Sequence, residues 1–117
     1  MAAPQIVDLT AIEPVVCPCG LARRAFADFD EFPGTLHLTE IHETALAHCH
    51  AHHTEIYVIL ECEPDAAIEL DGVQTPIFPL MSIAIPPGVV HRAIGKMRVL
   101  IVCHPEFDPN DEVIAGV

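Results

Sequence analysis

Hydrophobic and polar residues alternate with a period of two along much of this chain. Residues 36–41 and 68–71 both follow this alternation. Such a period is typical of a half-buried β-strand, whose successive side chains point to opposite faces. Three aliphatic and β-branched runs, at 56–60, 82–85 and 99–103, have the length and composition of strands. The pattern therefore predicts an all-β fold.

Proline and glycine divide the chain at short intervals. Asp71-Gly72 predicts a tight hairpin, because the turn needs a positive φ that glycine supplies. Pro33-Gly34 and Pro86-Pro87-Gly88 predict two further sharp corners. We expect residues 21–29 to form a strand with irregular flanks, and residues 106–112 to form a turn or a single helical turn after the last core strand. Many short strands separated by such turns favour a β-sandwich or a barrel.

Length and composition fit a single domain. The chain has 117 residues, of which 51% are hydrophobic and only 5% aromatic, with no tryptophan. We therefore expect one domain over residues 1–117, with a largely aliphatic core. Residues 1–15 are expected to form an N-terminal arm or an edge strand.

The chain is strongly acidic. It carries 17 acidic and 5 basic residues, which give a formal net charge of −12. This charge repels phosphate backbones and anionic lipids, so we expect neither a nucleic-acid nor a membrane partner. The N-terminus lacks the basic and apolar regions of a signal peptide, and no segment approaches the roughly 20 apolar residues of a membrane span. We expect a cytoplasmic protein whose five cysteines are reduced.

Histidines are concentrated in one segment. Five of the eight lie within residues 42–53. His48 and His50 are two residues apart, so a strand would direct both imidazoles to one point. Glu55 begins the next predicted strand, and His91 follows the Pro-Pro-Gly corner on a segment expected to face the first across a barrel. Three imidazoles and a carboxylate form a donor set for one divalent transition metal ion.

Two stretches of the sequence resemble the two motifs of the cupin superfamily. His-Cys-His at 48–50, followed after four residues by Glu55 and then Ile-Tyr-Val-Ile-Leu-Glu, resembles the first motif. Residues 82–85, followed by Pro-Pro-Gly-Val-Val and His91, resemble the second. The resemblance implies a small single-domain cupin with a double-stranded β-helix, or jelly-roll, barrel. It also implies four metal ligands, namely His48, His50, Glu55 and His91. The alternative pair of His50 and His52 leaves too few residues before the carboxylate.

The chain departs from the cupin motifs at turn positions. Cys62 stands where glycine usually closes the first motif. Leu80-Met81 stand where Gly-Asp usually opens the second motif, and Gly95 stands where asparagine often ends it. These positions shape turns and lie outside the ligand set. The departures therefore affect the expected turn geometry and substrate class more than metal binding.

Other polar residues are candidates for a role at the site. Tyr57 shares the strand face of Glu55 and is our candidate catalytic residue, with a buried structural aromatic as the alternative. Arg23 or Arg24 could hold a carboxylate or phosphate inside a barrel, or form a surface ion pair. We expect His52 and His53 in a solvated loop, with proton shuttling as the alternative. We expect core or surface packing for His37 and His42, with contact to the metal ligands or the substrate as the alternative. His104 is expected to pack, although it could instead point inward.

The expected function is metal-dependent chemistry on a small organic substrate. An open coordination position suits dioxygenase-type oxidation with Fe, or Lewis-acid chemistry with Mn, Ni, Co or Zn. We expect an enzyme, with an oxidoreductase of the dioxygenase kind as the first candidate. The alternatives are a sugar isomerase or epimerase, a lyase or cyclase, and a non-catalytic metal- or metabolite-binding protein. The apolar face of residues 56–60 that points away from the ligands must be buried against another sheet or a partner. We therefore expect a two-fold homodimer.

Overall fold

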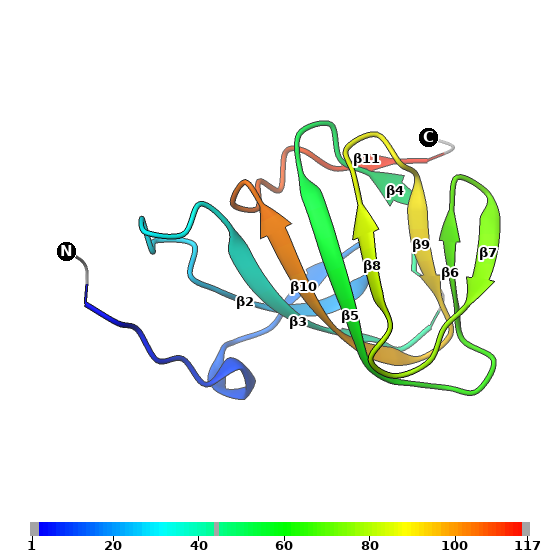
Figure 1. The fold of residues 1–117 in the computed structure, drawn as a ribbon, viewed down its shortest axis with the longest axis horizontal. Coiled ribbons are helices and arrows are strands. Elements are labelled where there is room, and N and C mark those ends of the chain that lie inside the picture. Colours follow the sequence, from blue (N-terminus) through cyan, green and yellow to red (C-terminus); the bar gives the residue numbers. More distant parts are fainter. Residues whose placement is uncertain (1–2, 44, 116–117) are drawn as a thin grey trace.

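The computed structural model describes residues 3–43 and 45–115, which form two antiparallel β-sheets (Figure 1). A short 3-10 helix, η1 (Leu9–Ala11), precedes the strands. The strands are β1 (Val15–Cys17), β2 (Gly20–Ala25), β3 (Thr35–Ile41), β4 (His48–Cys49), β5 (Thr54–Cys62), β6 (Ala67–Leu70), β7 (Val73–Pro76), β8 (Ser82–Ile85), β9 (His91–Ile94), β10 (Met97–His104) and β11 (Val113–Ile114). No helix in these residues is long and apolar enough to cross a membrane. The predicted all-β fold is confirmed.

The two sheets pack against each other and enclose the interior of a barrel. The larger sheet has the strand order β1-β2-β3-β10-β5-β8, and the smaller sheet has the order β11-β4-β9-β6-β7. Consecutive strands such as β5 and β6, or β8 and β9, belong to different sheets. The chain therefore crosses repeatedly between the sheets, as in a jelly-roll barrel.

The core lies between the sheets and is mostly aliphatic, as the composition predicts. β10 runs between β3 and β5, and its buried and half-buried residues alternate from Met97 to Cys103. Val99 and Ile101 of β10 are at most 1% exposed. They pack with Ile68 of the smaller sheet, so the two inner faces share one hydrophobic cluster. Tyr57 contributes an aromatic ring to this cluster.

The turns lie where glycine and proline predict them. Asp71 and Gly72, with φ of 47° and 83°, connect β6 to β7 in the expected tight hairpin. Gly88, with φ of 85°, lies in the corner before β9. Leu80 has φ of 72°, at a position where the chain departs from the cupin motif. A leucine therefore holds a left-handed conformation that glycine adopts without strain.

Both ends of the chain add structure outside the barrel. After β10 the chain passes through the predicted turn and then forms β11, which the sequence did not predict and which pairs with β4. At the other end, η1 contacts β2 and β3, and β1 begins at Val15. The residues before η1 extend toward the side of the molecule that carries the loop between β2 and β3 (Figure 1), and Gln5 lines a pocket there with Leu36 and Val102. Ile56, on the outer face of β5, is 41% exposed.

Candidate metal centre

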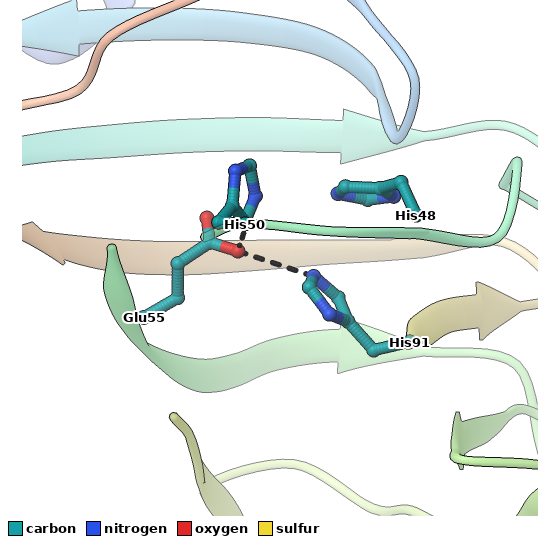
Figure 2. Close-up of side chains that lie close together, drawn as sticks. All are labelled: His48, His50, Glu55 and His91. Atoms are coloured by element: carbon teal, nitrogen blue, oxygen red, sulfur yellow. Dashed lines mark hydrogen bonds and ion pairs between the residues drawn. The ribbon is translucent and has the colours of Figure 1, made fainter. Parts of the chain in front are cut away.

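The structure gathers the four predicted ligands inside the barrel (Figure 2). His48 lies in β4, His50 directly after it, Glu55 near the start of β5, and His91 at the start of β9. All four residues are buried, with 1–4% of their surface exposed. One potential ligand atom from each residue lies within 4.8 Å of the others. These side chains are therefore close enough to share one ion.

Both sheets contribute to the cluster. His48 and His91 are cross-strand partners on β4 and β9 of the smaller sheet. Glu55 belongs to the larger sheet, and its side chain points toward His50 and His91. The expectation that the His48 and His91 segments would face each other across the barrel is wrong, because β4 and β9 pair directly. The carboxylate is the group that approaches from the opposite sheet.

Each of the three imidazoles is held by a backbone carbonyl. The distances from Nδ1 to the carbonyl oxygen are 2.9 Å for His48 to Leu46, 2.6 Å for His50 to Asp111, and 2.9 Å for His91 to Val89. A carbonyl oxygen can only accept, so Nδ1 carries a proton in each ring and donates it. A neutral ring held in this way presents its unprotonated Nε2 as a ligand.

Glu55 is the negative group of the cluster. Its Oε1 lies 3.0 Å from Nε2 of His50 and 3.1 Å from Nε2 of His91. Burial alone would raise the pKa of the Glu55 carboxyl, but the two imidazoles outweigh burial and hold this pKa below its ordinary range. Burial likewise opposes the charged form of His50, yet Glu55 raises the pKa of that imidazole. Burial, followed by the charge of His91, lowers the pKa of His48 to about 4, which keeps His48 neutral.

The donor set fits a divalent transition metal ion. Three Nε2 lone pairs and a carboxylate repel one another unless a proton or a metal ion lies among them. Nε2 of His50 is buried without a hydrogen-bond partner in the described part of the chain, because its close contact with Glu55 lacks hydrogen-bond geometry. Imidazole nitrogen and carboxylate oxygen are ligands for Fe, Mn, Ni, Co and Zn alike. The buried group could therefore bind a metal ion, and its ligand types do not select the metal.

Asp111 is a site residue that the sequence analysis missed. Its carbonyl oxygen accepts the Nδ1 proton of His50. Its carboxylate accepts from the backbone N–H groups of Ala51 and His52 at 2.8 and 2.9 Å. The same carboxylate lies 3.6 Å from Nδ1 of His53. Asp111 therefore holds both the His50 ring and the loop that follows it, and no local spacing in the sequence signals this contact.

A row of side chains extends from the cluster along the inner face of the larger sheet. The register pairs Arg24 of β2 with His37 of β3. Ile101 of β10 lies between His37 and Tyr57 of β5. Tyr57 is 1% exposed, and its ring centroid lies 6.1 Å from that of His91. Burial raises the pKa of Tyr57 well above its ordinary value, so its hydroxyl keeps its proton.

The two neighbouring arginines have different surroundings. Arg23 lies 3.9 Å from the Glu40 carboxylate in a half-exposed ion pair. Arg24 has no ion pair with any described residue, and its Nε is buried without a hydrogen-bond partner there. The guanidinium carbon of Arg24 lies 3.9 Å from the ring centroid of Phe107, whose ring lies 6.4 Å from that of His50. Arg24 is therefore the arginine beside the cluster.

The remaining histidines differ in exposure. His37 is buried, its Nε2 lies 2.8 Å from Oγ1 of Thr35, and burial followed by the charge of Arg24 lowers its pKa to about 4. His53 is buried, so its expected position in a solvated loop is wrong, and its Nε2 accepts from the Asp108 N–H at 3.1 Å. The exposed histidines are His42, His52 and His104. Exposure makes the expected packing role of His104 wrong.

The chain is similar in fold to several solved structures. A protein from Planctomyces limnophilus is 43% identical with a TM-score of 0.90, over 95% of this chain and 96% of its own. Pac13 from Streptomyces, a nucleoside dehydratase, is 14% identical with a TM-score of 0.79, over 97% of this chain and 92% of its own. Ectoine synthase from P. lautus is 20% identical with a TM-score of 0.77, over 95% of this chain and 89% of its own. No family model and no curated protein matches the chain.

The fold and these likenesses define a cupin-type β-barrel domain. The chain belongs to the same family as the Planctomyces limnophilus protein, whose name specifies no activity. Pac13 and ectoine synthase share the fold at identities too low to carry over a reaction. The chemistry of this protein is therefore argued from its own side chains.

Proposed function

We propose that this protein is a metal-dependent enzyme that performs lyase-type acid–base chemistry on a small organic acid. The residues that would hold the metal are His48, His50, Glu55 and His91. The proposal is carried by the convergence of three carbonyl-anchored imidazoles on one buried carboxylate. A divalent ion bound there supplies Lewis-acid polarisation of a substrate oxygen.

Arg24 supports an anionic substrate. Three other arginines, Arg23, Arg92 and Arg98, each lie beside a glutamate carboxylate. Arg24 instead stacks on Phe107 and has no ion pair with a described residue. In a chain of net charge −12, a cation in the barrel that pairs with no carboxylate of the described residues is available for a ligand. A guanidinium binds a carboxylate or a phosphate with two parallel hydrogen bonds, so we assign Arg24 to the anionic group of the substrate.

Tyr57 supports proton transfer at the same site. It follows Glu55 by two residues on β5, so both side chains share the inner face of the strand. Its buried hydroxyl holds a proton that it can donate to a leaving oxygen. We therefore propose Tyr57 as the general acid in an elimination of water.

The neighbouring structures are consistent with this reaction class. Pac13, named as a nucleoside dehydratase, eliminates water on the same barrel fold. Dioxygenase-type oxidation, which the sequence analysis favours, can use the same donor set and stays a prediction. The two reaction classes differ in one measurable property, because only oxidation consumes O2.

The test is a turnover screen with protein reconstituted separately with Fe(II), Mn(II), Co(II), Ni(II) and Zn(II). Small 2- and 3-hydroxy acids are followed by NMR under nitrogen and in air. We expect loss of water from at least one acid at the same rate in both atmospheres. Product that appears only with matching O2 uptake would replace the lyase proposal by oxidation. No turnover with any metal in either atmosphere would contradict both.

Three variants separate the proposed roles. Arg24→Gln should raise KM for the hydroxy acid by about tenfold or more, because it removes a bidentate contact. Arg23→Gln is the matched control on the adjacent residue and should leave KM unchanged. Tyr57→Phe should lower kcat by about a hundredfold while metal content stays the same. Equal KM values in the two arginine variants would contradict the role of Arg24.

A further inference from the structure

Two of the five cysteines meet at the turn between β1 and β2. Cys17 ends β1, Cys19 precedes β2, and their sulfur atoms lie 2.6 Å apart. Sulfurs at this separation need only a small further approach to reach the disulfide bond length of about 2.05 Å. Both side chains are partly accessible, whereas Cys103 is fully buried in the core. The turn therefore presents a close pair of thiols.

The backbone holds this pair in place. Cys17 pairs with Gly20, so Pro18 and Cys19 form a two-residue turn between them. The proline ring fixes one backbone dihedral of the turn. Gly20 has φ of 145°, and a Cβ at this position would overlap the carbonyl of Glu40 on β3. The end of the turn therefore lies tightly against β3, in a conformation that brings the two thiols together.

The two thiols differ in character. The Cys19 thiol lowers the pKa of Cys17 to about 7 against the opposing effect of burial, aided by the backbone N–H groups of Cys19 and Gly20 and the charge of Arg24. The hydrogen bond to Cys17, together with burial, raises the pKa of Cys19 well above its ordinary value. A more acidic thiol beside a less accessible one is the arrangement of an attacking and a resolving cysteine.

We propose that Cys17 and Cys19 form a redox-active dithiol that a low-molecular-weight disulfide, such as glutathione disulfide, oxidises to an intramolecular disulfide. The Cys17 thiolate attacks one sulfur of the glutathione disulfide, forms a mixed disulfide and releases one glutathione thiolate. Cys19 then loses its proton, attacks the Cys17 sulfur and releases the second glutathione. Two protein thiols are oxidised, one glutathione disulfide is reduced to two thiols, and the two thiol protons pass to the released glutathiones.

The dithiol lies close to the histidine cluster through hydrogen bonds. The carbonyl of Pro18, between the two cysteines, accepts from the Leu46 N–H at 3.0 Å. The Leu46 carbonyl in turn accepts the Nδ1 proton of His48 at 2.9 Å. A change at the cysteine turn is therefore two hydrogen bonds away from one of the cluster imidazoles. The redox proposal itself needs no metal, so it can be tested independently of the proposed function.

The experiment incubates the reduced full chain with glutathione disulfide, quenches it in denaturant with N-ethylmaleimide, and maps the thiols by tryptic mass spectrometry. Cleavage after Arg23 yields residues 1–23, which contain Cys17 and Cys19 and no other cysteine. After oxidation, we expect this peptide to carry no maleimide adduct and to be two hydrogens lighter than the reduced, unlabelled peptide. Cys49, Cys62 and Cys103 lie in other tryptic peptides and should remain labelled.

Two variants and one control test which cysteine attacks and which one resolves the mixed disulfide. Cys19→Ser should stop at a glutathione adduct on Cys17, because the resolving thiol is missing. Cys17→Ser should form neither the disulfide nor an equivalent adduct on Cys19. Cys49→Ser should behave as the wild type. Full maleimide labelling of the 1–23 peptide after oxidation would overturn the proposal, and so would a disulfide that forms equally fast in urea-unfolded protein.

Discussion

His50 donates its Nδ1 proton to the backbone carbonyl of Asp111, 61 residues further along the chain, at 2.6 Å. This contact joins the segment with the first two candidate ligands to the turn that follows β10. The Asp111 carboxylate reinforces it by accepting from Ala51 and His52. The position of one imidazole in the cluster therefore depends on a residue outside the four-residue cluster.

The first prediction concerns this support. Asp111→Ala should weaken divalent metal binding by about 10–100-fold, because the loop after His50 loses the two hydrogen bonds that hold it beside the Asp111 backbone carbonyl, which orients the ring. The measurement is metal affinity by competition with a chromophoric chelator, with circular dichroism to verify the fold. Asp108→Ala, in the same turn but exposed, is the control and should bind as the wild type. Equal affinity in both variants would show that the Asp111 carboxylate does not support the position of His50.

The second prediction concerns Leu80. Its left-handed backbone costs a leucine about 1–2 kcal/mol, and its side chain is 79% exposed, so little packing is lost on substitution. Leu80→Gly should raise the free energy of unfolding by about 0.5–1 kcal/mol after the greater chain entropy of glycine is counted. Thermal unfolding should show a Tm increase of roughly 2–6 °C. Ala84→Gly, at an exposed position in β8, is the control and should lower Tm. A lower Tm in Leu80→Gly would contradict the proposed backbone strain at this residue.

The third prediction concerns the outer face of the larger sheet. Ile56 and Val58 of β5 lie beside Val102 and Leu100 of β10, and all four side chains point away from the barrel interior. We propose that a second copy of the chain covers this face in a two-fold dimer. Light scattering after size-exclusion chromatography should give twice the chain mass, and Ile56→Glu should give a monomer. Val73→Glu, exposed on β7 of the other sheet, should remain dimeric, and a monomeric wild type would contradict the proposal.

The sequence predicted much of the fold and the cluster because both leave local signals. The period-two alternation indicated the strands, and Asp71-Gly72 indicated the hairpin that the structure contains. The side chains of His48, His50 and Glu55 also lie close together in the structure, since these residues are close along the chain. Features that depend on long-range register left no such signal.

The missed features are of that long-range kind. The contact of Asp111 with His50 follows from the path of the C-terminal turn, and β11 forms only because β4 offers it a free edge. The choice between Arg23 and Arg24 depends on which one faces the interior when β2 pairs with β3. His53 is buried because Asp108 and Asp111 approach it from the same turn. None of these contacts can be read from residues that are neighbours in sequence.

The most direct test of the proposed metal centre is the metal content of protein purified without a chelator and of protein reconstituted with divalent metals. It is made by mass spectrometry on the wild type, on His50→Ala, and on His52→Ala as the exposed control from the same segment. A metal centre at these four residues should give about one equivalent of a single transition metal in the wild type and in His52→Ala, and its loss in His50→Ala. A wild type that binds no metal even after reconstitution, or a His50→Ala variant that binds it equally well, would contradict the proposed metal centre.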